Sequence, residues 1–200
     1  MALTKVSNNA LSNISVLPSA IETGALTLLS TQTASSSASI EFTSGIDSTY
    51  SSYVFKFINC NPATDQVYFE WQGSTDTGST YGVTVTNTVF QAYHDEADTG
   101  SGLSYEAGRD IAQGTSNLNL SARTGNGADE CCSGTLQLFN PSSSTYVKHY
   151  ISRVQTYYDG DYSIEHFTAG YFNTISPIDA VKFLFSSGNF DGIIKMYGVK

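Results

Sequence analysis

The tripeptide Asp-Thr-Gly occurs twice in the chain, beginning at Asp76 and at Asp98. Pepsin-like and retroviral aspartic proteases use this tripeptide to bring two carboxylates together, so that the pair shares one proton and each group acts as acid or base. Those enzymes place it after an apolar strand, whereas here it follows Ser-Thr and Glu-Ala, and the two copies lie close together in sequence. Asp side chains cap turns, and Gly accepts the positive φ that many turns need. The sequence therefore predicts two turns here rather than a protease dyad.

Carboxylates also gather in residues 94–98, which read His-Asp-Glu-Ala-Asp, and in residues 159–161, which read Asp-Gly-Asp. Loop carboxylates are ligands of Ca²⁺, which leaves a calcium site open as an alternative. The ligand order of an EF-hand loop is missing. We expect solvated acidic loops without a metal or other cofactor.

Three cysteines, Cys60, Cys131 and Cys132, are too few for a disulfide framework. The adjacent pair could form a vicinal disulfide, or Cys60 could pair with one of them. Synthesis in a cytoplasm favours three reduced thiols. A zinc site would need more ligands at short spacing.

Other catalytic signatures are missing from the sequence. There is no Gly-x-Ser-x-Gly elbow and no phosphate-binding loop, and His94, His149 and His166 lie far apart along the chain. His149 and His166 fall inside strand-like runs, where a structural histidine with satisfied hydrogen bonds is expected. The chain is therefore predicted not to be an enzyme.

Thirteen tyrosines leave two interpretations open. Aromatic faces stack on sugars and the phenol adds a hydroxyl, which is typical of a saccharide-binding surface. Tyrosine also fills half-buried positions in β-sheets, where its propensity is high.

The elements that carry these residues are predicted to be strands, because apolar residues alternate with period two. In "SSYVFKFIN", Tyr53, Phe55 and Phe57 share one face. The same alternation gives three further sets of inward-facing residues: Val67, Phe69 and Trp71; Leu136 and Leu138; Val181, Phe183 and Phe185.

Turn signals separate about ten such runs from residue 25 onward, among them Asp159-Gly160, where a hairpin would place the positive φ on Gly. This number and spacing predict an all-β fold: an antiparallel β-sandwich, jelly-roll-like, forming one domain over residues 23–200. The long segment 92–117 is expected to be functional or to carry short structure of its own.

The final segment, 193–200, also alternates. Ile194, Met196 and Gly198 share one face, and the other face is partly apolar too. This pattern predicts a strand inside a sheet, so that deleting 193–200 prevents folding.

Residues 1–22 differ from the rest and are predicted to form an extended N-terminal arm, weakly helical over 7–17. The arm has apolar residues with few partners nearby, which suits docking on another subunit; the alternative is a frayed terminus. The candidate docking residues are Leu3, Val6, Leu11, Ile14, Val16 and Leu17.

Composition excludes several classes of partner. Charged residues make up only 14%, and the net charge is −9, without the clustered Lys and Arg of nucleic-acid-binding proteins. No apolar run reaches the length of a signal peptide or a membrane span. We expect no nucleic-acid partner and no membrane insertion.

The opening "MALTKVSNNALSNI" resembles the first residues of many tailed-phage fibre and appendage proteins. The segments "SYVFKFINCNPATD", "VFQAYHDEA", "LQLFNPSSSTYVKHYISRVQ" and "AGYFNTISPIDAVKFLFSSGNFDGIIKMYGVK" resemble a family of virion-associated proteins from tailed phages of aquatic bacteria. The resemblance implies a β-rich, trimeric protein that decorates a capsid or forms a tail appendage.

The sequence thus predicts a non-enzymatic virion structural protein, assembled in the host cytoplasm and docked through its arm. Its expected partners are itself, as a homotrimer, and other capsid or tail proteins. The alternative is a receptor- or glycan-binding module of a tail fibre, which would bind a host surface glycan.

Overall fold

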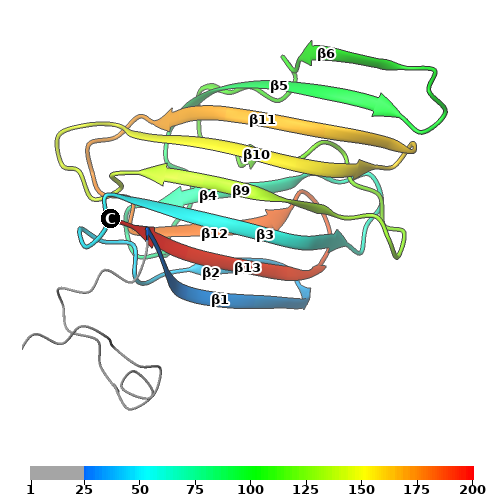
Figure 1. Ribbon diagram of the computed structural model, residues 1–200. Coiled ribbons are helices and arrows are strands. Elements are labelled where there is room, and N and C mark those ends of the chain that lie inside the picture. The colour runs from blue at the N-terminus through cyan, green and yellow to red at the C-terminus, as the bar shows by residue number, and fades with distance from the viewer. Residues whose placement is uncertain (1–24) are drawn as a thin grey trace, which may run out of the picture.

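The computed structural model describes residues 25–200, which form two antiparallel β-sheets packed face to face (Figure 1). The larger sheet has the order β1-β13-β3-β9-β10-β11-β5-β6, with β7 also paired to β5. The smaller sheet has the order β2-β12-β4-β8. The strands are β1 (Leu26–Ser37), β2 (Ile40–Phe42), β3 (Ser52–Pro62), β4 (Phe69–Ser74), β5 (Val85–Asp95), β6 (Ser101–Tyr105), β7 (Ala112–Gly114), β8 (Leu118–Asn119), β9 (Cys132–Phe139), β10 (Lys148–Tyr158), β11 (Tyr162–Phe172), β12 (Ala180–Phe185) and β13 (Phe190–Val199).

Eight of these strands form a jelly roll. Taken in chain order, β1, β2, β3, β4, β8, β9, β12 and β13 are strands one to eight. One sheet then has the order 1-8-3-6 and the other 2-7-4-5, which is the jelly-roll arrangement of two Greek keys. The predicted fold is confirmed.

Two insertions widen the larger sheet. Strands β5, β6 and β7 are inserted between β4 and β8, and the β10–β11 hairpin is inserted between β9 and β12. Together they add a region that we call the wing, made of β10, β11, β5, β6 and β7, at the top of Figure 1. The connection from β7 to β9, which includes β8, contacts its inner face, for example at Thr168.

The core between the two sheets is built from the residues that the alternation predicted to face inward. Phe55, Phe57, Phe69, Trp71 and Phe183 are all at most 2% exposed. Their rings pack at 5–6 Å between centroids, for example 5.1 Å between Phe57 and both Phe69 and Phe183. Such edge-to-face contacts stabilise an aromatic core beyond the burial of its area.

The C-terminal strand β13 lies between β1 and β3, as predicted for a strand inside a sheet. Ile194, Met196 and Gly198 are buried, and the residues between them are half-buried. The strand begins at Phe190, earlier than the alternation suggested, because a bulge near Gly192 joins its two parts. Gly192 has φ +151°, and a Cβ there would lie 2.9 Å from the Cα of Cys60.

The segment 92–117 carries short structure of its own, one of the two expectations for it, namely the end of β5 with β6 and β7. Two details differ from the sequence-based expectation. Within residues 25–200, thirteen strands replace about ten, since β2, β7 and β8 are only two or three residues long. The predicted hairpin at Asp159-Gly160 forms, but its positive φ, 60°, falls on Asp161, in a three-residue loop between Tyr158 and Tyr162.

The predicted arm, 1–22, with its helical segment and its docking residues, lies outside the described residues. Within residues 25–200, no helix is long and apolar enough to cross a membrane.

Candidate functional site

The inner face of the wing is unusually polar for a sandwich interior. Ser152, Thr156, His166 and Thr168 are all buried there at about 1% exposure or less. The segment between β6 and β9 covers this face, and one bond that joins the two layers runs from the Thr168 hydroxyl to the Asn119 carbonyl oxygen, at 3.0 Å. Two adjoining hollows lie on the part of this inner face that the segment does not cover.

The two hollows share Gln91 and Tyr158, and we call them together the tyrosine trough. One, of about 150 Å³, is lined by Tyr68, Gln91, Glu106, Arg109, Ala122, Arg123 and Tyr158. The other, of about 290 Å³, is lined by Gln91, Tyr93, Tyr158, Tyr162 and Ile164. Four tyrosines therefore line one continuous surface.

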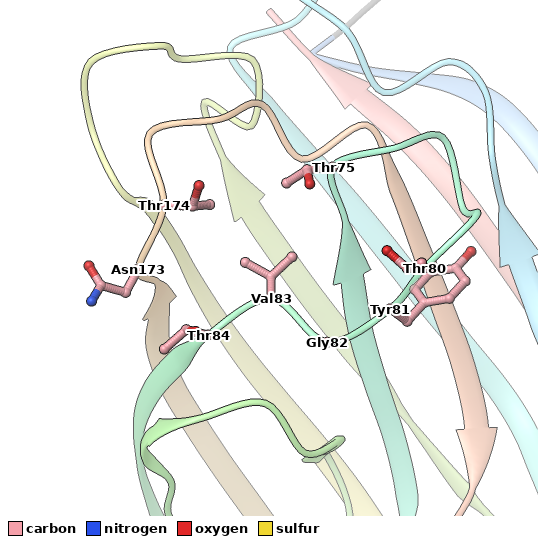
Figure 2. Close-up of a pocket in the computed structure, with 8 residues that line it drawn as sticks. All are labelled: Thr75, Thr80, Tyr81, Gly82, Val83, Thr84, Asn173 and Thr174. Carbon is pink, nitrogen blue, oxygen red and sulfur yellow. The ribbon is translucent and has the colours of Figure 1, made fainter.

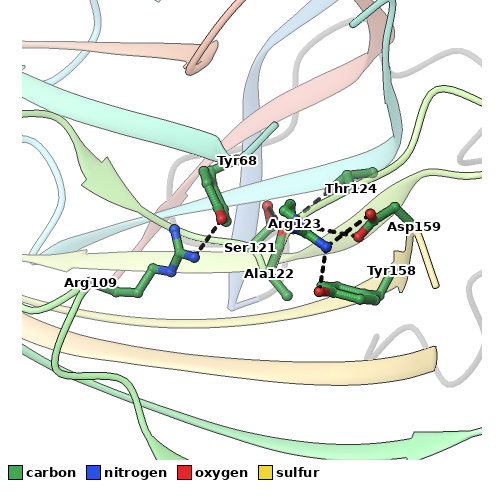
Figure 3. Close-up of polar contacts among 8 residues, drawn as sticks. All are labelled: Tyr68, Arg109, Ser121, Ala122, Arg123, Thr124, Tyr158 and Asp159. Carbon is green, nitrogen blue, oxygen red and sulfur yellow. Dashed lines mark hydrogen bonds and ion pairs between the residues drawn. The ribbon is translucent and has the colours of Figure 1, made fainter. Parts of the chain in front are cut away.

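Arg123 holds one side of the trough in place (Figure 3). Its Nε and Nη2 donate to the two carboxylate oxygens of Asp159, each at 3.0 Å, and Nη2 also donates to the Tyr158 hydroxyl oxygen at 2.7 Å. The Asp159 side chain is only 7% exposed. The hydrogen bonds with Asp159 raise the pKa of Arg123, so this pair stays charged and fixes the ring of Tyr158.

Arg109 forms the opposite side. Its guanidinium carbon lies 3.5 Å from the centre of the Tyr68 ring, and Nη2 donates to the Tyr68 hydroxyl oxygen (Figure 3). Within residues 25–200, no carboxylate lies within ion-pairing distance of this guanidinium. Its other N–H groups therefore remain available to a bound molecule or to water.

The floor between these arginines is formed by strands of the wing. Tyr162 packs edge-to-face against Tyr93 at 6.1 Å and against Tyr158 at 5.7 Å. Tyr93 is opposite Gly102 on β6, and a Cβ at that glycine would lie 3.0 Å from the Tyr93 hydroxyl oxygen. In the described part of the chain, the side-chain amide of Gln91 has no hydrogen-bond partner.

His166 is paired with Gln91 in the register of β11 and β5 and is 1% exposed. Neither of its ring nitrogens has a hydrogen-bond partner among residues 25–200. Burial, and secondarily the charge of Arg109, lowers the pKa of His166 to about 4, so the ring is neutral at pH 7. His166 lies on a strand, as predicted. The prediction that its ring has satisfied hydrogen bonds is wrong.

The outer face of the wing carries a row of apolar side chains, which we call the outer-face patch: Phe90, Leu103, Tyr105, Ile151 and Phe167. The rings of Phe90 and Phe167 stack at 4.6 Å and 6°, so each covers one face of the other. Arg153 lies over Phe167 and pairs with Glu165. Leu103 is 77% exposed and Ile151 57%.

A larger hollow of about 490 Å³ lies between the loop 75–84 and the β11–β12 connection (Figure 2). Threonines and Asn173 form most of its lining, and no charged side chain belongs to it. Its single aromatic residue, Tyr81, donates to Glu41 at 3.2 Å and lies beneath Lys182. This hollow therefore offers fewer groups for recognition than the tyrosine trough.

The two Asp-Thr-Gly segments are turns, as predicted. Asp76 accepts hydrogen bonds from the Ser74 hydroxyl at 2.7 Å and the Thr80 amide at 2.8 Å, and these bonds hold its pKa at about 2. In the second copy Asp98 takes a positive φ of 56°, and the neighbouring Asp95 caps the turn. The two segments flank the ends of β5, whose eleven residues span about 35 Å. They are not brought together.

The acidic loops use their carboxylates within the protein. Asp95 accepts from the amides of Thr99 and Gly100 at 2.8 and 3.0 Å, and Asp159 pairs with Arg123. His94 lies 3.3 Å from Asp98 on the surface. Residues 25–200 contain no cluster of three or more side chains placed to hold a metal ion.

All three cysteines are free thiols. Cys60 and Cys132 are opposite each other in the register of β3 and β9 and are fully buried, while Cys131 is half-buried. Burial, and secondarily the neighbouring Cys60, raises the pKa of Cys132.

No family model, curated protein or solved structure matches this chain. The residues of the trough were not singled out from the sequence either. Tyr68, Arg109, Arg123 and Tyr158 come from four separate segments. Bridges of Thr124 to Val67 and to Tyr158, and the hydrogen bond from Arg109 to Tyr68, bring these segments together. The one signal in the sequence was the abundance of tyrosine.

Proposed function

We propose that this chain is a non-enzymatic structural protein of a phage particle, which decorates the particle surface or forms part of a tail appendage. It docks through its N-terminal arm and associates with itself as a trimer. The segments that resemble tailed-phage virion proteins support this role. The jelly roll suits it as well, because viral capsid proteins use the same fold.

The observation that carries the proposal is the outer-face patch. Large apolar side chains are exposed on the adjacent strands β5 and β6 of one sheet, with Phe90 at 46%, Tyr105 at 56% and Leu103 at 77% exposure. Contiguous exposed apolar surface marks contact sites between proteins. Phe90 and Phe167 stack on each other, so one face of each ring is already covered. The patch therefore suits packing against another protein better than stacking on sugar rings.

The experiment compares the wild type with a Leu103→Ser/Ile151→Ser double variant. Both positions are exposed on the outer face, so the change should leave the melting temperature within a few degrees of the wild type. Ile175→Ser is the matched control, because Ile175 is 62% exposed but lies in the β11–β12 connection.

Oligomeric state is measured by light scattering, and association with particles by co-sedimentation of the tagged chain. The wild type and Ile175→Ser are expected to be trimers that sediment with particles. The double variant is expected to be a monomer that sediments more weakly, because it docks through one arm instead of three. A monomeric wild type that stays in the supernatant, or a double variant that behaves like the wild type, would contradict the proposal.

A further inference from the structure

We propose that the tyrosine trough is a binding site for a neutral carbohydrate, which it takes as a short run of hexopyranose units. The site is formed by the inner face of the wing and does not depend on the outer-face patch or on the role in a particle. Three properties of the trough carry the inference: its shape, its aromatic lining and its balance of charge.

The shape is that of a short open channel. Its two hollows, of about 150 and 290 Å³, meet at Gln91 and Tyr158. The larger is near the lower end of the range for pockets that hold small ligands. A molecule longer than one ring can therefore lie along both hollows and contact both ends.

The lining has the aromatic groups that sugars need. Tyrosine offers an apolar ring to the C–H face of a pyranose and a hydroxyl to its oxygen atoms. Tyr162 contacts Tyr93 and Tyr158 edge-to-face, and such a contact covers at most one face of one ring. All four tyrosines of the trough are half-buried, so part of each side chain is exposed. Arg109 and Arg123 lie over Tyr68 and Tyr158, which leaves Tyr93 and Tyr162 as the rings without a cation above them.

The polar groups can both donate and accept, as sugar hydroxyls require. Arg109 has N–H groups without an acceptor in the described part of the chain, and Gln91 has both an unused carbonyl and an unused NH₂. The phenol oxygens of Tyr68 and Tyr158 each accept from an arginine, which leaves their own O–H groups free to donate. The Arg123–Asp159 pair already holds the Tyr158 side chain in one conformation. Binding therefore costs little conformational entropy at this side chain.

The charges at the trough indicate a neutral ligand. Arg109 and Arg123 supply two positive charges, and Glu106 and Asp159 supply two negative charges at or beside the same surface. Because these charges balance, the trough has no net attraction for a carboxylate or phosphate. A hydroxyl-rich molecule without charge matches this lining best.

The test uses an array of immobilised neutral and acidic oligosaccharides from bacterial envelopes, with affinities for the bound neutral oligosaccharides then measured by calorimetry. Gln91→Ala removes a side chain that makes no internal hydrogen bond, so it should not affect folding. Its control is Gln155→Ala, on the outer face of β10, which removes a glutamine side chain that donates to the Thr156 carbonyl oxygen at 3.1 Å. Tyr162→Ala removes an aromatic wall, and Tyr146→Ala is its control, because Tyr146 is 69% exposed and outside the trough.

The wild type and both controls are expected to bind the same neutral oligosaccharides, with Gln91→Ala and Tyr162→Ala weakened about tenfold or more. Saturation-transfer NMR should place the sugar protons near tyrosine rings. The inference is overturned if the wild type binds no neutral oligosaccharide, if it binds only acidic ones, or if the two trough variants bind like their controls. None of these results would change particle association, so this test is distinct from that of the proposed function.

Discussion

His166 makes the protein sensitive to acid in a pH range where few other groups act. The ring is 1% exposed and has no hydrogen-bond partner in residues 25–200, so protonation would place an unpaired charge inside the wing. Its pKa falls from 6.5 to about 4 on folding. Between these values the unfolded chain binds more protons than the folded one, so stability is lost as the pH falls.

The magnitude follows from the two pKa values. Linkage predicts a loss of about 2 kcal/mol in the free energy of unfolding between pH 7.5 and pH 5, and about 3 kcal/mol once the pH is below 4. Asp76 and Asp95, whose pKa values are lowered, lose their contributions only at more acidic pH. Glu70, whose pKa is raised by burial, acts with the opposite sign. The quantity to measure is therefore the difference between the wild type and His166→Leu in the loss of unfolding free energy.

Urea unfolding of the wild type, His166→Leu and His149→Gln at pH 7.5 and pH 5 tests this prediction. His149 is exposed on the outer face of β10, so its variant should keep the wild-type loss. His166→Leu should lose about 2 kcal/mol less than the wild type over the same range. Equal losses in the wild type and His166→Leu, or an NMR titration of His166 near pH 6.5, would show that burial of His166 does not cause the acid sensitivity.

Three other changes probe the packing and pairing of strands in the larger sheet. Gly134→Ala should make the protein insoluble or lower its unfolding free energy by about 2 kcal/mol or more, because the new Cβ would lie 2.6 Å from the Val154 Cα. Gly108→Ala is the control and should be neutral, because a Cβ there would have nothing within 4 Å. Equal melting temperatures of the two variants would be inconsistent with this packing. Lys148→Met should cost about 1–3 kcal/mol in urea unfolding, because the buried ammonium donates to the carbonyls of Tyr146 and Thr174 at 2.7 and 3.0 Å; unchanged stability would argue against those bonds. Deleting residues 193–200 should prevent folding, because β1 and β3 both pair with β13, and a soluble truncated chain that melts cooperatively would show this expectation to be wrong.

The strands of the jelly roll and their inward faces were predictable because alternation is a local property of the chain. Tyr53, Phe55 and Phe57 are buried as a set, and so are Val181, Phe183 and Phe185. The wing was not predictable, because its strands alternate in the same way as the others. Only pairing decides that β5 joins the larger sheet beside β11, and pairing depends on contacts between residues far apart in sequence.

The candidate site was still less accessible from the sequence. Alternation indicates that a residue such as Gln91 or Tyr162 faces one side of a strand, but not what covers that side. The partners of Arg123 show the difficulty, because Asp159 is 36 residues away and lies in a turn whose own geometry differs from the expected one. The Asp-Thr-Gly turns were predictable because a turn depends on neighbouring residues alone.

Quantitative mass spectrometry of purified particles tests the proposed function most directly. We expect this chain to be present in every preparation at a fixed number of copies per particle, in a multiple of three, as closed symmetry requires of a trimer. A high copy number would indicate capsid decoration, and a low one a tail appendage. Infectious particles that contain no copy of the chain would show that it is not a structural protein of the particle.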